Sequence, residues 1–487
     1  MVSEGEASRI PWLSHAMDLV YVLTFLTLCL TLTALQVDKS SAALSIQKLI
    51  IRKEQRNVVD ESGADDQIKT QRLGFCSFQR TYLSVYFLAV AADWLQGPMV
   101  YALYDAYGFS KHEIAALFIA GFGSSMVLGT YAGALADNFG RKRLALVYCA
   151  FYTVSCLTKH FPHFGVLLVG RLLGGMATSL LFSVFEAWYV NEHESRGFPA
   201  EWLSESFSRA SFGNGLVAIL CGQLAGLVAG PFGFVAPFDV AIGVLVLVAV
   251  LIHHNWTENY GMRGEHVSRG LQRALRHTLR DSKMRWLGIL QSCFEAAMYI
   301  FVFLWTPALQ GAQENPTNPI PHGMIFSTFM VALMLGSVLF DRILRRITRE
   351  EKDASAVKTM NNAVLWLMQI LLAISICSFV VAAVGDRLHW SAAYLAMIGF
   401  EVTCGLYFPA MGCLRGILIP EECRAAVMNL FRVPMNLLVV LILAYVDRFT
   451  NRSVFFAAAG LNAIALLALV RLKAAKPEPD TTGEAHA

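Results

Sequence analysis

The chain has 487 residues, of which 56% are hydrophobic and only 15% are charged. Its mean hydropathy of +0.51 is far above that of soluble domains, about a quarter of whose residues are charged. This composition excludes an ordinary soluble protein and indicates that lipid surrounds most of the chain. The net charge of +3 provides no global basic field, so we expect a lipid bilayer and no nucleic acid as partner.

The first hydrophobic segment, residues 19–37, carries no charge and is long enough to cross a bilayer. A signal peptide would have a basic start, whereas here Glu4 and Glu6 outnumber Arg9. We therefore expect an uncleaved extra helix, followed by a charged loop over 38–80, so that residues 1–80 form an N-terminal region of their own.

A regular series of apolar segments follows, and it predicts twelve core spans. The expected spans are about 81–104, 113–136, 144–160, 163–189, 206–229, 234–254, 285–309, 323–341, 361–384, 389–415, 425–446 and 453–471. The longest gap, 255–284, is rich in arginine and separates the sixth span from the seventh. We expect a six-helix bundle over 81–254, a second one over 285–472 and a polar tail over 473–487.

Lysine and arginine concentrate on one side of this series, counted loop by loop. Cytoplasmic loops of membrane proteins are enriched in these residues, so the side that holds the central loop and the tail is predicted to be cytoplasmic. The extra helix then starts outside, and the C-terminus lies inside. Lys159 falls in an outer loop on this count.

A compact turn motif joins the second and third core spans. It is built from Gly133, Asp137, Gly140, Arg141 and Arg143. A second, less complete copy lies 204 residues downstream and contains Asp341 and Arg345, with Leu344 in place of the second glycine. This offset indicates two similar halves. We expect both copies to hold neighbouring helices in register and to control gating.

Charged residues inside the spans are costly in lipid, at roughly 2.5–3.5 kcal/mol near the bilayer centre, so each needs a partner, a wet cavity or a function. Asp93 and Glu295 lie 202 residues apart, at equivalent places in the two halves. We expect the charged residues to converge on a central cavity; alternatively, they form buried pairs that lock helices together. Glu186 is the least informative, because it lies at the membrane interface. The set comprises Asp93, Arg171, Glu186, Arg209, Glu295, Glu401 and Arg432.

Several longer phrases carry a family resemblance, with the turn motif placed after the second core span. They include Ala91-Ala-Asp-Trp-Leu-Gln96, Gly170-Arg-Leu-Leu-Gly-Gly175, Phe185-Glu-Ala-Trp-Tyr189, Phe301-Val-Phe-Leu-Trp-Thr-Pro307 and Cys404-Gly-Leu-Tyr-Phe-Pro409. Over about residues 80–470 the chain resembles the molybdate-anion transporter branch of the major facilitator superfamily. The resemblance implies an all-α membrane protein that imports molybdate or a similar oxyanion across the plasma membrane by alternating access. We expect a monomer.

The chemistry of the intramembrane residues is compatible with this function. Arginine has a permanent charge and several donors for oxyanion oxygens, so Arg171, Arg209 and Arg432 are the candidate substrate ligands. A dianion entering a cell at about −100 mV climbs roughly 4.6 kcal/mol, so accumulation needs a co-transported cation. Asp93, Glu295 and Glu401 are the candidates for proton coupling or charge pairing.

Two other functions stay open from the residues. One is a transporter of a neutral nutrient such as a sugar, and the other is a transport-dead membrane sensor or scaffold. The ten cysteines are scattered without metal-ligand spacing, and no P-loop or nucleophile motif is present. We therefore expect no metal, no cofactor and no enzymatic activity.

Overall fold

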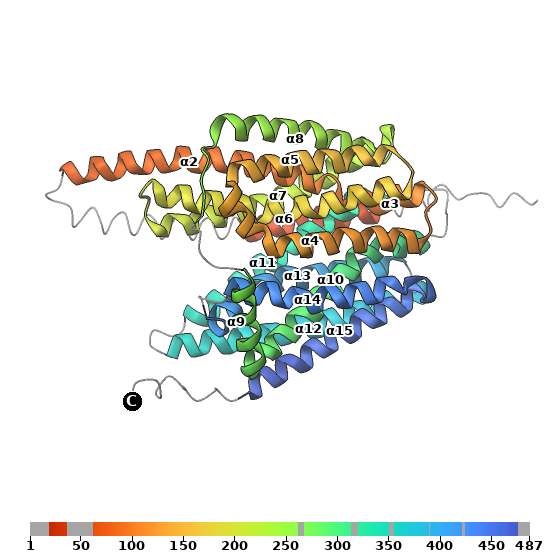
Figure 1. The fold of residues 1–487 in the computed structure, drawn as a ribbon. Helices are drawn as coiled ribbons and strands as arrows, with labels where there is room; N and C mark the ends of the chain where they lie inside the picture. The colour runs from red at the N-terminus through yellow and green to blue at the C-terminus, as the bar shows by residue number, and fades with distance from the viewer. Residues whose placement is uncertain are drawn as a thin grey trace, which may run out of the picture.

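The computed structural model describes residues 19–36, 62–261, 267–312, 320–349, 355–388, 390–420 and 424–475. These residues form helices and connecting turns, without a strand in any of the described ranges. The helices gather into two bundles, one above the other in the view of Figure 1. The all-α fold class predicted from the sequence is confirmed.

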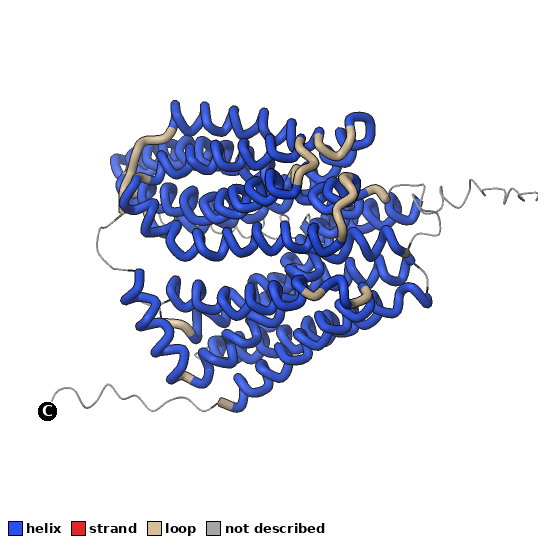
Figure 2. The backbone as a smooth tube through the Cα atoms, turned by 45° about the vertical axis from the view of Figure 1, so that its right-hand side comes forward, coloured by secondary structure: helices blue, strands red, loops and turns tan. Residues whose placement is uncertain are grey.

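The N-terminal bundle consists of the first helices of the series and two short 3-10 turns. Its elements are α2 (Ser62–Trp94), η1 (Gly97–Met99), α3 (Val100–Ala106), α4 (Lys111–Phe139), α5 (Arg141–Leu157), η2 (Thr158–His160), α6 (Phe164–Ser195), α7 (Ala200–Phe232) and α8 (Ala236–Asn255). Its helices are joined by short loops, as Figure 2 shows along the tube. Tight loops of this kind keep sequential helices antiparallel.

The C-terminal bundle repeats this plan. Its elements are α10 (Ser282–Gly311), α11 (His322–Arg349), α12 (Ser355–Leu388), α13 (Trp390–Leu418), α14 (Arg424–Ala444), η4 (Val446–Arg448) and α15 (Asn451–Ala474). Between the bundles the chain forms a short helix, α9 (Val267–Arg280), which packs against α14 and α10. Figure 1 shows α9 lying across the direction of the bundle helices.

Twelve helices in the described ranges are long and apolar enough to cross a membrane, and residues 19–36 form one of them. α5 is not among these twelve because it has only 17 residues, but it packs against α6 and α8 within the N-terminal bundle. Counting α5, the bundles contain the predicted twelve core helices, and residues 19–36 are the extra N-terminal helix.

The helix boundaries differ from the expected ones at two places. α2 begins at Ser62 rather than near 81, so much of the predicted charged loop is a helical extension. Residues 256–261, expected within the central loop, are bound to the N-terminal bundle instead: the Trp256 ring stacks on Trp188 with ring centroids 3.9 Å apart. Residues 1–18, 37–61 and 476–487, which carry the predicted outer N-terminus and the tail, lie outside the described residues.

The extra helix of residues 19–36 contacts both bundles. Tyr21 packs against Trp390 and Tyr394 of α13, with ring centroids 5.2 and 4.8 Å apart. Further along, its apolar side chains cover Ile219 of α7 and Met334 of α11. The extra helix thus lies on the seam between the two bundles, beside α7 and α11.

The two ends of the molecule differ in how the bundles meet. We call the end that holds Gly140 the motif end and the opposite one the far end. At the far end the Lys111 ammonium donates to Asn451 Oδ1 at 2.7 Å, and His112 Nδ1 lies 3.3 Å from an Asp447 carboxylate oxygen. These contacts join α4 to the C-terminal bundle, so the bundles touch at the far end.

The closest approach at the far end is between glycine backbones. A Cβ atom at Gly323 of α11 would lie 2.3 Å from the Gly222 carbonyl oxygen and 2.7 Å from the Gly226 nitrogen of α7. Only glycine allows the helices to approach so closely across the seam. The closed far end therefore depends on the absence of a side chain at residue 323.

We expect Gly323→Leu to favour separation of the bundles at the far end. Overpacking costs about 1–3 kcal/mol, which shifts a two-state population by about fivefold to a hundredfold. A cysteine replacing the buried Thr306 of α10, in a background without other cysteines, would then react several-fold faster with a membrane-impermeant maleimide. Gly230→Leu is the matched control, because nothing lies within 4 Å of a Cβ atom there. Equal labelling in both variants would contradict the role of the glycine contact.

Candidate functional site

Two adjoining cavities lie between the bundles. The larger has a volume of about 310 Å³ and the smaller about 230 Å³. Phe122, Ser125, Thr178 and Tyr299 line both, so the cavities meet along these four side chains. Tyr299 comes from α10 and packs edge-on against Phe122 of α4 at 4.8 Å. Both bundles therefore build the walls, as expected for a substrate site in a two-bundle transporter.

Arg171 of α6 lines the larger cavity. Its Nε donates to the Leu117 carbonyl oxygen at 3.2 Å, and its guanidinium carbon lies 4.9 Å from the centroid of the Phe118 ring. Gly121 leaves room for it, because a Cβ atom there would lie 2.6 Å from Nη2. Among the described residues no carboxylate forms an ion pair with Arg171. Its terminal nitrogens are thus available to an anion in the cavity.

Arg432 of α14 lines the smaller cavity from the opposite bundle. It reaches toward the N-terminal bundle, since a Cβ atom at Gly129 would lie 3.5 Å from its Nη1 atom. No ion pair is formed by Arg432 within the described ranges either. The sequence-based expectation that Arg171 and Arg432 face a shared space from opposite halves therefore agrees with the geometry.

Asp93 of α2 is half-buried in the wall of the larger cavity. The Tyr152 hydroxyl of α5 donates a hydrogen bond to Asp93 Oδ1, and the same hydroxyl lies 3.4 Å from Thr178 Oγ1. Asp93 is thus held by a phenol rather than by a cation. Arg171 lines the same cavity, and no ion pair joins it to Asp93 among the described residues.

Glu295 of α10 occupies the equivalent place in the second half, but its partners differ. Arg415 Nη2 lies 2.9 Å from Glu295 Oε1, and the Tyr407 hydroxyl donates to the same oxygen at 3.1 Å. Arg415 Nε also donates to Gln291 Oε1 at 3.1 Å. Glu295 is therefore neutralised by Arg415, as in the alternative of buried pairs that lock helices together.

Glu401 does not join the other charges. It lies buried on α13, on the part of that helix that packs against α11 and α12, and it lines neither central cavity. Two glycines near Glu401 on α13 approach the neighbouring helices closely. Gly405 lies against the Leu333 backbone of α11, and Gly399 lies against the Ser378 side chain of α12. The expectation that Glu401 converges with the arginines is wrong in this structure, because its helix position faces the interior of the C-terminal bundle.

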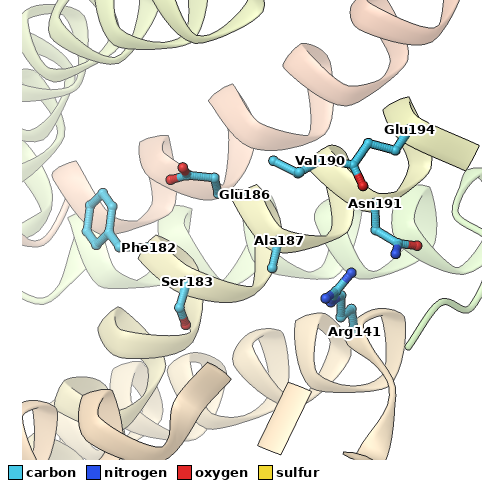
Figure 3. Close-up of a pocket in the computed structure, with 8 residues that line it drawn as sticks. All are labelled: Arg141, Phe182, Ser183, Glu186, Ala187, Val190, Asn191 and Glu194. Carbon is cyan, nitrogen blue, oxygen red and sulfur yellow. The ribbon is translucent and has the colours of Figure 1, made fainter. Parts of the chain in front are cut away.

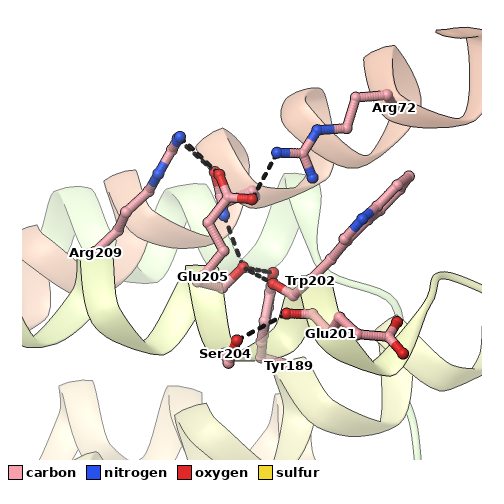
Figure 4. Close-up of polar contacts among 9 residues, drawn as sticks. Arg72, Tyr189, Glu201, Trp202, Ser204, Glu205 and Arg209 are labelled. Carbon is pink, nitrogen blue, oxygen red and sulfur yellow. Dashed lines mark hydrogen bonds and ion pairs between the residues drawn. The ribbon is translucent and has the colours of Figure 1, made fainter. Parts of the chain in front are cut away.

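Arg209 also lies away from the cavities, in a polar network between α2 and α7. Arg209 Nη2 is 2.7 Å from Glu205 Oε1, and its Nη1 donates to Gln79 Oε1 at 2.7 Å. Arg72 binds the other oxygen of Glu205 at 2.5 Å, so one carboxylate bridges two arginines (Figure 4). The Arg209 side chain is 57% exposed. The expected convergence of Arg209 on the central cavity is therefore wrong, because Glu205 one turn earlier holds it.

The turn motif is stabilised by a residue from the segment after α8. Gly140 has φ +98° and would collide with Glu258 if it carried a Cβ atom. The Glu258 carboxylate accepts from the backbone nitrogens of Lys142 at 2.9 Å and Arg143 at 3.2 Å. A carboxylate at a helix N-terminus satisfies free N–H groups and is favoured by the helix dipole. Glu258 thus caps α5.

The structure describes the side chains of only some of the remaining motif residues. The side chain of Asp137 and the local placement of Gly133 lie outside the described residues. In the second copy, Arg345 Nε and Nη2 each lie 3.0 Å from an oxygen of Asp341. That copy lies within α11 instead of in a turn, because Leu344 replaces the glycine that would end the helix.

A third cavity, of about 470 Å³, lies at the motif end (Figure 3). It contains Arg141, Glu186 and Glu194, and it shares Phe182 and Ser183 with the smaller central cavity. The three cavities follow one another from the motif end toward the far end. Glu186, expected at the membrane interface, lines the cavity at the motif end.

Sequence reasoning missed three residues at these sites. Lys159 was placed in an outer loop, but it lines the larger cavity and is 1% exposed. Arg415 was counted with the inner loop, although it forms the buried pair with Glu295. Glu258 belongs to no recognised sequence motif, so no sequence pattern predicted its role. Among the described residues, no cluster of three or more His, Cys, Asp and Glu side chains could bind a metal ion.

Similarity to known proteins agrees with this architecture. A family model described as sugar transporters with 12 transmembrane segments matches residues 57–400. The molybdate-anion transporter of Xenopus tropicalis is 40% identical over 367 residues, which cover 75% of this chain and 78% of that protein. The molybdate-anion transporter of Xenopus laevis is 38% identical over 427 residues, covering 84% and 91%.

Solved structures of transporters share the fold at low sequence identity. The nucleoside transporter NupG superposes with a TM-score of 0.64 at 12% identity, covering 82% of this chain and 100% of that one. The peptide-transporter-family protein PepTSo also gives 0.64, at 11% identity, covering 82% and 98%. With the two-bundle fold, the turn motif and these relatives taken together, the chain belongs to the molybdate-anion transporter family of the major facilitator superfamily.

Proposed function

We propose that this protein transports molybdate, or a closely similar tetrahedral oxyanion, by alternating access between its two bundles. The observation that carries the proposal is the pair Arg171 and Arg432. They belong to opposite bundles, line adjoining cavities and form no ion pair among the described residues. The Xenopus relatives are named molybdate-anion transporters, which supports the same substrate.

The cavity walls suit an oxyanion. An arginine guanidinium keeps its charge and presents a planar fork of donors that matches the oxygens of an anion. Tyr299 lines both cavities and its hydroxyl can add a neutral donor, whereas Thr178 Oγ1 donates to the Gly174 carbonyl oxygen at 3.0 Å and Ser125 Oγ lies 2.9 Å from Ser179 Oγ. A tetrahedral anion in these adjoining cavities would thus be bound by charge and by hydrogen bonds.

Import of a dianion against a membrane potential requires a compensating charge, since about 4.6 kcal/mol opposes its entry at −100 mV. We assign the coupling proton to Asp93, because it is the acid on the larger cavity and its partner is the Tyr152 hydroxyl. Protonation would remove the negative charge beside Arg171 and strengthen anion binding. Glu295 serves instead as the partner of Arg415.

The membrane orientation in the proposal follows the charge distribution of the loops. The motif end faces the cytoplasm of a cell whose plasma membrane the protein spans, and the chain works as a monomer. The far end, where Lys111 and Asn451 join the bundles, is then the outer gate in its closed state. The capped turn at Gly140 and the Asp341–Arg345 pair stabilise the inner ends of α5 and α11.

A sugar transporter is the second candidate function. The description of the matching family favours it, and the aromatic side chains of Tyr101, Tyr299 and Trp305 on the larger cavity suit a sugar ring. Two arginines without a carboxylate partner favour an anion instead. Uptake of labelled molybdate into vesicles with reconstituted protein, with and without a pH gradient, tests the proposal; competition by glucose but not by tungstate would favour the sugar.

We expect Arg171→Ala and, separately, Arg432→Ala to lower the initial rate of molybdate uptake by about tenfold or more, because a charge-assisted hydrogen bond is worth about 1.5–3 kcal/mol. Lysine at either position should restore part of the rate, since it keeps the charge but lacks the fork. Arg209→Ala is the matched control, because Glu205 holds Arg209 outside the cavities. Normal uptake by both cavity variants would overturn the assignment.

We expect Asp93→Asn to abolish accumulation driven by a pH gradient while molybdate exchange across the membrane continues. Asparagine has nearly the same shape but cannot carry the proton, so only the coupled step is lost. Both fluxes can be measured in the same vesicles, by net uptake and by exchange against unlabelled molybdate. Asp105→Asn removes an exposed acid at the far end and should change neither. Undiminished accumulation by the Asp93 variant would exclude it as the proton carrier.

A further inference from the structure

Lys159 is the most unusual charged residue in the described part of the chain. It is the second residue of η2, which follows α5 at the far end of the molecule. Its side chain is among the largest fully buried side chains. Its Nζ atom has no hydrogen-bond partner among the described residues. Burial of an unpaired ammonium is unfavourable, so its retention requires an explanation.

The backbone at Lys159 is fixed by its neighbours. The Tyr107 hydroxyl donates to the Lys159 carbonyl oxygen at 2.5 Å. The side chain passes Tyr104, with Nζ 5.5 Å from the centroid of that ring. An ammonium over an aromatic face gains a modest attraction, which orients the side chain but does not replace hydration. The ammonium is thus held in place without being neutralised.

The larger cavity brings Lys159 and Arg171 together. Both line it, with Asp93 as the acid on the same wall. Asp93 accepts its hydrogen bond from Tyr152 instead of pairing with either cation. The cavity wall therefore has two cations and one acid, and neither cation forms an ion pair within the described ranges.

We infer that Lys159 and Arg171 form a dicationic subsite for a tetrahedral dianion at the far end of the larger cavity. The inference rests on the proposed function and assigns a second cationic ligand to it. The dianion supplies the missing partner of the Lys159 ammonium and takes the free donors of Arg171. Arg432, on the smaller cavity nearer the motif end, belongs to the next position along the path.

The charge of the anion gives a test that separates ligand binding from a structural role. Perrhenate is a tetrahedral monoanion close in size to molybdate and tungstate, so it probes the same shape with half the charge. Binding of each anion to the purified full-length protein in detergent can be measured by isothermal titration and by the rise in melting temperature. The variants are Lys159→Met and Lys159→Gln, and Arg448→Met removes an exposed cation from the same end as the control.

We expect both Lys159 variants to lose about tenfold to a hundredfold in affinity for molybdate and tungstate, as for a lost charge-assisted hydrogen bond. Their affinity for perrhenate should fall much less, because one charge remains at Arg171. Without anion, Lys159→Met should melt at a higher temperature than the unmodified protein, since an apolar side chain of similar length replaces a buried unpaired charge. The control should behave like the unmodified protein.

The possible results separate the two proposals. Equal losses for monoanion and dianion, or unchanged affinity for molybdate, would overturn the dicationic subsite while the transport function stands. A lower melting temperature for both Lys159 variants would assign the lysine a structural role and also overturn it. If the unmodified protein binds neither molybdate nor tungstate, the proposed function itself fails.

Discussion

The structure depends on positive charges that the protein does not neutralise. An unpaired cation in a low-dielectric interior is costly, so a membrane protein retains one only where water or a ligand compensates it. Arg171 and Lys159 meet this condition on the larger cavity, and Arg432 meets it on the smaller one. The Tyr152 hydroxyl holds Asp93 and Arg415 holds Glu295, so cations outnumber acids on the two central cavities among the described residues. An anion is the missing component.

The same passage must open alternately at its two ends, and the contacts between the bundles are suited to that. At the far end they include a few polar pairs, the glycine backbones that meet at Gly222 and Gly323, and contacts of the Phe303 ring with Tyr101 and Phe118. Separation of the bundles breaks these contacts but leaves the helix packing within each bundle in place. The extra helix of residues 19–36 contacts Ile219 of α7 and Met334 of α11 along the same seam.

Hydropathy predicted the helices well because a bilayer leaves the backbone few options, so each span appears in the sequence as an apolar run. The site was less predictable because composition does not show how a helix is rotated about its axis or which way a side chain near a helix end points. Lys159 and Arg415 lie near span ends, where a long side chain can point either to water or inward, and both point inward. Arg209 was expected inward, yet Glu205 one turn away holds it. Glu258 acts through backbone nitrogens of α5, and such a cap has no sequence signature at a distance.

The two repeated halves hold their equivalent acids with different partners, and each half is left with one arginine that has no carboxylate partner among the described residues. Asp93 and Glu295 occupy equivalent positions, and either one could neutralise a cavity arginine. In the first half the Tyr152 hydroxyl holds Asp93, which leaves Arg171 free. In the second half Arg415 takes Glu295 as its partner, which leaves Arg432 free. A phenol can release a carboxylate when a proton arrives, whereas a buried ion pair resists protonation. In the proposed mechanism the first half therefore takes up the proton, and the Glu295–Arg415 pair of the second half stays unchanged.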